Sequence, residues 1–307
     1  MKKVVAIVIG IILVIGVIVT RQHGLSQANT KIYEQAVAMQ ATVDEIGYKD
    51  FKITDYPVAF YDGEQDYVLT WQNDTYHIEK RKAVMDSIVA TAYPVDGHYE
   101  VLSPTVEKMS SLLGLMSVGS AEYGEKEHIS TLWHEAFHCY QLTNYLENIE
   151  VICPTGVKES IIAEVVDVNS QAVTLFEQQA ELLEAAVKCD ELDKVKAYIV
   201  KYRELEQLRN QLFSQEVLQL EAYYTRVEGT ACYIEACVYE MQLPESFWEH
   251  YVEGISEYAG GSGKYYKIGM AQCMILDKLN ADWKNTFDFS ENMMELIYRE
   301  LEIQDEV

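Results

Sequence analysis

Basic residues are scarce in this sequence. Its 307 residues include 24 lysines and arginines against 49 aspartates and glutamates, which gives a formal net charge of −25. Nucleic acids are bound through clustered Lys and Arg, and a surface this acidic repels polyanions at long range. The composition therefore argues against a nucleic-acid partner.

Proline is also scarce, and the cysteines are not grouped. The sequence has only 5 prolines and is rich in Glu, Leu and Ala, which favours helices over a β-sandwich. The 6 cysteines include no C-x-x-C pair and no dense framework, so disulfides are possible but not implied. Buried free thiols are the alternative. The cysteines are Cys139, Cys153, Cys189, Cys232, Cys237 and Cys273.

The N-terminal residues differ from the rest. An uncharged apolar run at residues 4–20 follows two lysines and ends at Arg21, and it has about the minimum length of a bilayer span. No small-x-small cleavage site follows the run, as a removed signal peptide would require. We therefore expect residues 1–23 to form a transmembrane signal anchor in the cell membrane and residues 24–307 to form one extracytoplasmic domain. If the segment is cleaved, the domain is secreted.

The remaining pattern predicts an α+β fold that is mostly α. Three segments rich in aromatic and β-branched residues are separated by turn-forming residues, so we expect a small N-terminal antiparallel sheet from residues 51–61, 66–71 and 75–81. Elsewhere the apolar residues recur with helical spacing. Helices are expected near residues 26–46, 126–147, 159–188, 191–213, 215–242, 246–258, 265–280 and 290–303.

One segment carries metal-binding chemistry. His134, Glu135 and His138 form an H-E-x-x-H motif within the expected helix 126–147. Residues four apart lie about 40° apart around a helix axis, so both imidazoles face one side and can chelate one metal ion. Glu135 lies beside this pair, where it can reach a water molecule on the metal without being a ligand. The alternative is a core helix whose two histidines are satisfied by hydrogen bonds.

A glutamate is expected to complete the ligand set, because no further histidine motif follows His138. Glu221, Glu228 and Glu235 recur every seven residues and share one face of the expected helix 215–242. Seven residues rise about 10.5 Å, so only one of the three can bind the ion. We expect this ligand to be Glu228. Glu221 and Glu235 would then accept hydrogen bonds from the free N–H groups of the imidazoles.

Small residues support the choice of Glu228. Gly229 and Ala231 beside it would let its helix approach the H-E-x-x-H helix closely. Glu164 is the alternative third ligand, since it lies nearer in sequence to His138. Glu164 has no neighbouring glycine and lies in a long acidic amphipathic segment, so we rank it behind Glu228.

The two motifs together resemble those of gluzincin-type zinc metallopeptidases. His134-Glu135-x-x-His138 and Glu228-Gly229-x-Ala231-x-Tyr233-x-Glu235 carry the resemblance, which covers roughly residues 50–242. It implies Zn²⁺ as the cofactor, a zincin-like fold in which two helices supply the ligands, and a protein or peptide substrate. The two motifs are farther apart here than in the best-known gluzincins. The insert at residues 159–217 is expected to form a helical hairpin over the cleft.

The resemblance implies hydrolysis of peptide bonds with Glu135 as general base. Such sites commonly add a hydrogen-bond donor for the developing oxyanion. Two alternatives remain: a catalytically inactive, zinc-stabilised binding or sensor module at the cell surface, and an acidic interaction domain without metal. The eligible oxyanion donors are Tyr223, Tyr224, His128, Tyr265 and Tyr266.

Overall fold

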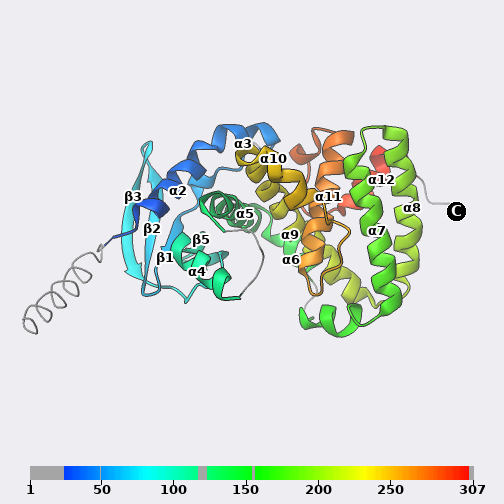
Figure 1. Ribbon diagram of the computed structural model, residues 1–307, viewed down its shortest axis with the longest axis horizontal. Helices are drawn as coiled ribbons and strands as arrows, with labels where there is room; N and C mark the ends of the chain where they lie inside the picture. Colours follow the sequence, from blue (N-terminus) through cyan, green and yellow to red (C-terminus); the bar gives the residue numbers. More distant parts are fainter. Residues whose placement is uncertain (1–23, 49, 117–122, 154–155, 304–307) are drawn as a thin grey trace, which may run out of the picture.

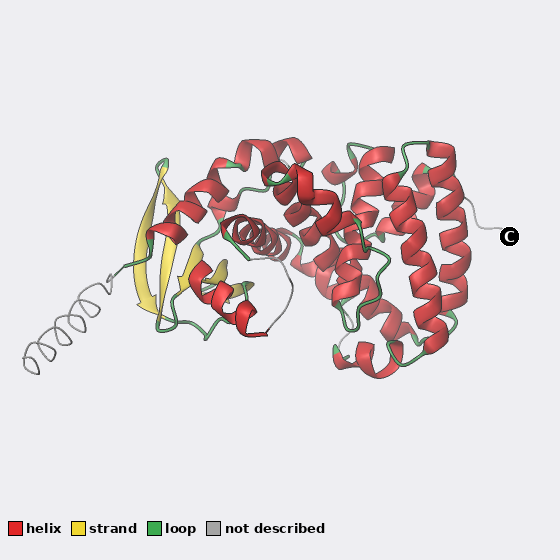
Figure 2. Cartoon of the chain, viewed as in Figure 1, coloured by secondary structure: helices red, strands yellow, loops and turns green. Residues whose placement is uncertain are grey.

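A five-stranded sheet lies at one end of an otherwise helical chain in the computed structural model (Figures 1 and 2). The structure describes residues 24–48, 50–116, 123–153 and 156–303. The predicted signal anchor at residues 1–23 therefore lies outside the described residues. Within the described part of the chain, no helix is long and apolar enough to span a membrane.

The sheet is mixed, with the strand order β3-β2-β1-β5-β4. β1 pairs with β2 antiparallel and with β5 in parallel, and the remaining pairs are antiparallel. The strands are β1 (Val58–Tyr61), β2 (Gln65–Gln72), β3 (Thr75–Lys82), β4 (Thr91–Val95) and β5 (His98–Pro104).

The prediction of an antiparallel sheet was right for the first three strands and wrong for the whole sheet. β4 and β5 were not expected, and β5 pairs with β1 in parallel. Pro94 obscured β4 as a strand, because proline is tolerated only at a sheet edge, and β4 is the edge strand. Asp96 and Gly97, both at positive φ, form the tight turn between β4 and β5.

Helices form the rest of the structure. Most expected helices are confirmed, and α9 has the predicted bounds. The expected helix at 26–46 is split in two, and those at 159–188 and 246–258 each contain a π-helical turn. The helices are α2 (Gln27–Ala38), α3 (Gln40–Ile46), α4 (Val106–Met116), α5 (Glu125–Asn144), α6 (Leu146–Ile152), α7 (Ser170–Lys188), α8 (Leu192–Asn210), α9 (Gln215–Gln242), α10 (Pro244–Phe247), α11 (Gly263–Leu279) and α12 (Met293–Glu300).

α5, the helix that carries the H-E-x-x-H motif, runs through the core. It packs against α2, β4 and β5 on one side and against α9 on the other. Trp133 and Phe137 are fully buried and meet Phe51 edge to face, with ring centroids 5.4 and 5.1 Å apart. The polar side chains of His134 and His138 instead face α9. The apolar face of α5 thus fixes the direction in which both histidines point.

The predicted hairpin in the insert is present but does not lie over α5. α7 and α8 pack against each other, and α7 also packs against α11. Both helices lie at the end of the molecule farthest from the sheet (Figure 1). The hairpin therefore extends the helical half of the molecule.

α9 and α11 touch through two glycines. A Cβ atom built on Gly269 would lie 2.6 Å from the Cα of Gly229 and would overlap the carbonyl oxygen of Thr225. Only residues without a side chain allow this approach. The expectation that Gly229 brings α9 close to α5 was therefore wrong, since its missing side chain makes room for α11.

Replacing Gly269 with alanine should destabilise the protein. The new methyl group meets backbone atoms that cannot move aside, so we expect a loss of about 3 kcal/mol in the free energy of unfolding. Gly263 in the same helix is the control, because a Cβ atom there meets nothing within 4 Å. Urea unfolding of Gly269→Ala, Gly263→Ala and the unchanged protein would measure both effects. Equal stability of the two variants would contradict the glycine contact.

Candidate metal centre

Three side chains from two helices converge on one point. The Nε2 atom of His138 lies 3.1 Å from the Nε2 atom of His134 and 3.1 Å from the Oε2 atom of Glu228. The Nε2 atom of His134 lies 3.6 Å from the same oxygen. Both histidines are buried and Glu228 is partly buried, and the three ligand atoms form a group that can hold a metal ion. The predicted ligand set is therefore brought together.

The first imidazole is oriented by Glu235. The Nδ1 atom of His134 lies 2.8 Å from the Oε2 atom of Glu235, whose other oxygen accepts the hydroxyl hydrogen of Tyr251 at 3.0 Å. A carboxylate can only accept, so Nδ1 carries a proton, and Nε2 is the nitrogen left to face Glu228 and a metal ion. The role predicted for Glu235 matches this contact.

The second imidazole is oriented by Gln141, a residue that the sequence analysis missed. The Nδ1 atom of His138 lies 2.7 Å from the Oε1 atom of Gln141. The amide nitrogen of Gln141 donates to the carbonyl oxygen of Val227 and to the hydroxyl of Thr230, at 2.9 and 2.8 Å. These bonds fix the oxygen toward His138. The i+3 spacing on one helix face could have indicated this contact.

The charges of the site are balanced within it. Burial alone would lower the pKa of His134, but the carboxylates of Glu228 and Glu235 outweigh burial and raise it well above its ordinary value. Burial alone would raise the pKa of Glu228, but the two imidazoles outweigh it and lower that pKa. A cation at the point of convergence satisfies both nitrogen lone pairs and the carboxylate at once.

Glu221 does not orient either imidazole, and this prediction was wrong. Its carboxylate pairs with the guanidinium of Arg209, with Oε2 2.7 Å from Nη1, and accepts a hydrogen bond from the hydroxyl of Tyr265. It lies two turns before Glu228 on α9, too far to reach the histidines. Gln141 instead orients the second imidazole, which was the role predicted for Glu221.

The alternative third ligand does not join the group. Glu164 lies in the π-helical turn Ile162–Val166 and is exposed. Among the described residues, the metal-binding group consists of His134, His138 and Glu228. The geometry therefore selects Glu228 over Glu164.

Glu135 is held beside the group by the sheet. Its Oε2 atom accepts the backbone N–H of Ala92 on β4 at 2.9 Å. The side chain is only partly buried, and it belongs to the residue next to His134. The edge strand thus positions a carboxylate next to the metal-binding group without pairing it with a positive charge.

Of the candidate oxyanion donors, Tyr266 lies at the site. Its ring stacks on His134 with centroids 6.4 Å apart. Burial raises its pKa, and the charge of the Glu228 carboxylate raises it further. Tyr223 and Tyr224 pack against each other. Tyr265 bonds Glu221 instead.

His128, the remaining candidate, is a core residue. It is fully buried between Ser103 and Tyr123, at 3.2 and 3.0 Å. Burial lowers its pKa to about 4. A neutral imidazole satisfied on both nitrogens has no free donor for a substrate.

The cysteines take no part in the site. All six are free, and Cys139, Cys232 and Cys273 are buried. Burial raises the pKa of the Cys139 thiol well above its ordinary value, which disfavours the reactive thiolate. The alternative of free thiols is therefore confirmed for all six cysteines, and that of buried thiols for three of them.

No model of a known protein family, no curated protein and no solved structure matches this chain. The site is therefore interpreted from its own geometry and chemistry.

Three replacements should separate the roles of the glutamates in metal binding. With Zn²⁺ as the probe, Glu228→Ala should lose affinity by more than about 100-fold, because it removes a ligand. Glu235→Gln should lose about 10–100-fold, the usual cost of losing an outer hydrogen-bond partner. Glu164→Ala is the control and should bind like the unchanged protein. Competition with a chromogenic chelator would measure all three, and a large loss for Glu164→Ala would contradict the assignment.

Proposed function

We propose that this protein is a zinc-dependent metallopeptidase of the gluzincin type, with His134, His138 and Glu228 as zinc ligands. The observation that carries the proposal is that Glu235 and Gln141 hold the Nδ1 atoms of both histidines, so that both Nε2 atoms face Glu228. Two imidazole nitrogens and one carboxylate, with a further position left to water, make up a usual catalytic zinc site.

The spacing of the ligand atoms supports zinc. Ligands about 2.0–2.1 Å from an ion at tetrahedral angles lie about 3.3 Å from one another. The three distances here are 3.1, 3.1 and 3.6 Å. The zincin-like fold is part of the same proposal, with α5 and α9 as the ligand-bearing helices and the mixed sheet beside them.

The chemistry assigns separate tasks to the neighbouring side chains. Zinc supplies polarisation of the substrate carbonyl and acidification of water. Glu135 accepts the proton of the attacking water and returns it to the leaving amine. The backbone N–H of Ala92 keeps this carboxylate in place. Tyr266 donates its hydroxyl hydrogen to the developing oxyanion, since its ring stacks on His134 and the charge of Glu228 acts on its hydroxyl.

The sheet edge offers a place for a peptide substrate. β4 is the last strand of the sheet, and its outer side reaches α5 through the contact between Ala92 and Glu135. An extended peptide that adds to such an edge gains main-chain hydrogen bonds. A substrate in this position would present its backbone to Glu135.

The cellular setting is part of the proposal and rests on the sequence. The apolar run at residues 4–20 favours a single-pass anchor in the cell membrane with the peptidase domain outside the cytoplasm. The acidic remainder of the chain would be repelled by anionic headgroups, which holds the domain away from the bilayer.

Replacing Glu135 with glutamine tests the function. The variant should keep its zinc content but lose hydrolysis of a general substrate such as casein, because the amide cannot accept a proton. Glu125→Gln, an exposed change in the first turn of the same helix, should leave hydrolysis unchanged. If the unchanged protein binds zinc but cleaves nothing, it is an inactive zinc-stabilised module instead.

Replacing Tyr266 with phenylalanine tests the oxyanion donor. We expect kcat to fall by about 100-fold with little change in KM, because the hydroxyl acts on the transition state. Tyr223→Phe is the matched control and should keep its activity, since this hydroxyl contacts none of the ligands. Equal effects of the two changes on kcat would rule out the role of Tyr266.

A further inference from the structure

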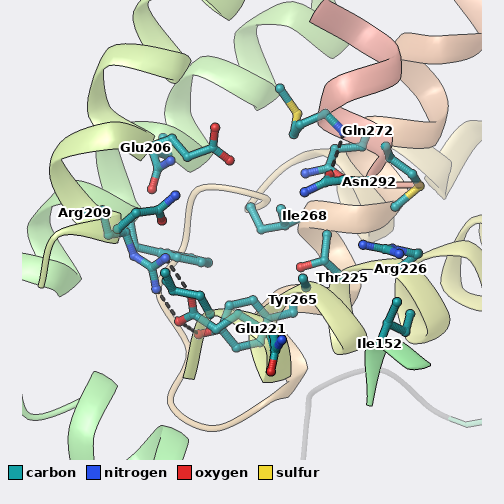
Figure 3. Close-up of a pocket in the computed structure, with 18 of the residues that line it drawn as sticks. Ile152, Glu206, Arg209, Glu221, Thr225, Arg226, Tyr265, Ile268, Gln272 and Asn292 are labelled. Carbon is teal, nitrogen blue, oxygen red and sulfur yellow. Dashed lines mark hydrogen bonds and ion pairs between the residues drawn. The ribbon is translucent and has the colours of Figure 1, made fainter. Parts of the chain in front are cut away.

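A second cavity lies in the helical half of the molecule, away from the metal centre (Figure 3). It has a volume of about 440 Å³ and opens between α7, α8, α9, α11 and α12. This volume falls within the range of small-molecule sites. Neither the metal-binding group nor Glu135 lines it.

One wall of the cavity carries a buried cation that forms no ion pair with a described residue, although the charges of Asp288 and Glu291 act on it. Arg226 is 7% exposed, and its Nη1 atom donates to the carbonyl oxygens of Phe289 and Ser290, at 2.9 and 2.8 Å. Its Nε and Nη2 groups have no partner among the described residues. Burial lowers its pKa to about 10, so the guanidinium stays charged at neutral pH.

Arg226 is an exception within this fold. Seven Asp, Glu, Lys and Arg side chains are buried in the described part of the chain, and six of them form an ion pair. A buried charge without a partner is costly, so its presence beside a cavity indicates an anionic ligand. Arg209, which also lines the cavity, is already paired with Glu221.

Two other lining residues, Glu206 and Gln272, offer acceptors. Glu206 lies across the cavity from Arg226 (Figure 3), and it is contacted by the hydroxyl of Tyr298 at 2.8 Å but forms no ion pair with a described residue. Burial raises the pKa of this carboxyl. The Oε1 atom of Gln272, a residue 2% exposed, is buried without a hydrogen-bond partner. The charges of Arg209 and Arg203 also act on the Glu206 carboxyl. Its second oxygen and the amide oxygen of Gln272 remain as acceptors that suit an ammonium group.

The rest of the lining includes several apolar side chains. Ile268 lies between Glu206 and Arg226 in Figure 3. The other apolar lining residues include Ile152, Leu218, Met293 and Met294. A ligand that fills this space therefore carries one negative group, one positive group and an apolar part.

We propose that this cavity binds a small apolar zwitterion, a free α-amino acid or a dipeptide, with its carboxylate on Arg226 and its ammonium group on Glu206 and Gln272. The same two helices that carry Glu228 and Tyr266 supply Arg226 and Gln272. The bound molecule would therefore brace α9 against α11 near the glycine contact. The binding site does not depend on the proposed peptidase activity.

Calorimetric titration of the full-length chain tests this assignment. The Glu135→Gln form is used, so that no peptide is turned over. L-leucine and leucyl-leucine distinguish an amino-acid site from a dipeptide site. N-acetyl-leucine lacks the ammonium group and leucinamide lacks the carboxylate, so each should bind at least tenfold more weakly than leucine.

A variant of Glu206 completes the test. Glu206→Gln keeps the shape of the side chain. It should weaken the binding of leucine at least tenfold, but should not weaken the binding of N-acetyl-leucine any further. Glu204→Gln, an exposed loss of the same charge on α8, is the matched control. Arg226 also supports the backbone, so leucinamide rather than a replacement probes its role. No binding of either zwitterion, or equal binding by N-acetyl-leucine, would overturn the proposal.

Discussion

The close contact between Gly229 and Gly269 sets the distance between α9 and α11, and both candidate sites depend on that distance. α9 carries Glu228 and α11 carries Tyr266, which stacks on His134. On the other side of the same pair of helices, Arg226 and Gln272 line the second cavity. A larger residue at either glycine would push the helices apart and disturb both sites together.

The three evenly spaced glutamates of α9 show how a regular pattern acquires separate roles. Glu221 is neutralised by Arg209 from α8, Glu228 faces two imidazoles of α5, and Glu235 bonds His134 and Tyr251. The helix presents all three on one face, and the neighbouring helices decide what each of them does. A carboxylate buried with a guanidinium supports the fold, whereas one buried beside two imidazoles can share a metal ion with them, because imidazoles, unlike a guanidinium, can give up a proton and bind the ion.

The parts of the structure that sequence predicted are those set by local periodicity. His134, His138, Glu228 and Glu235 were placed correctly, because helical spacing fixes which side chains share a face. Arg209 as the partner of Glu221, and the parallel entry of β5 beside β1, depend on contacts between distant segments. Periodicity carries no information on such contacts. Gln141 was missed because a glutamine is not a ligand, although its i+3 position was visible.

The buried charges of this acidic chain fall into two groups, complete ion pairs and candidate binding sites. Asp66 and Glu100 share Arg81 in the sheet, while Asp167 pairs with Lys264 among the helices. These pairs are complete, so they call for no ligand. The metal-binding group differs because its three ligand atoms converge on one point. The second cavity differs because Gln272, which lines it, keeps an amide oxygen without a partner. Since burial makes unpaired polar groups costly, such convergence is the expected mark of a molecule or ion bound from outside.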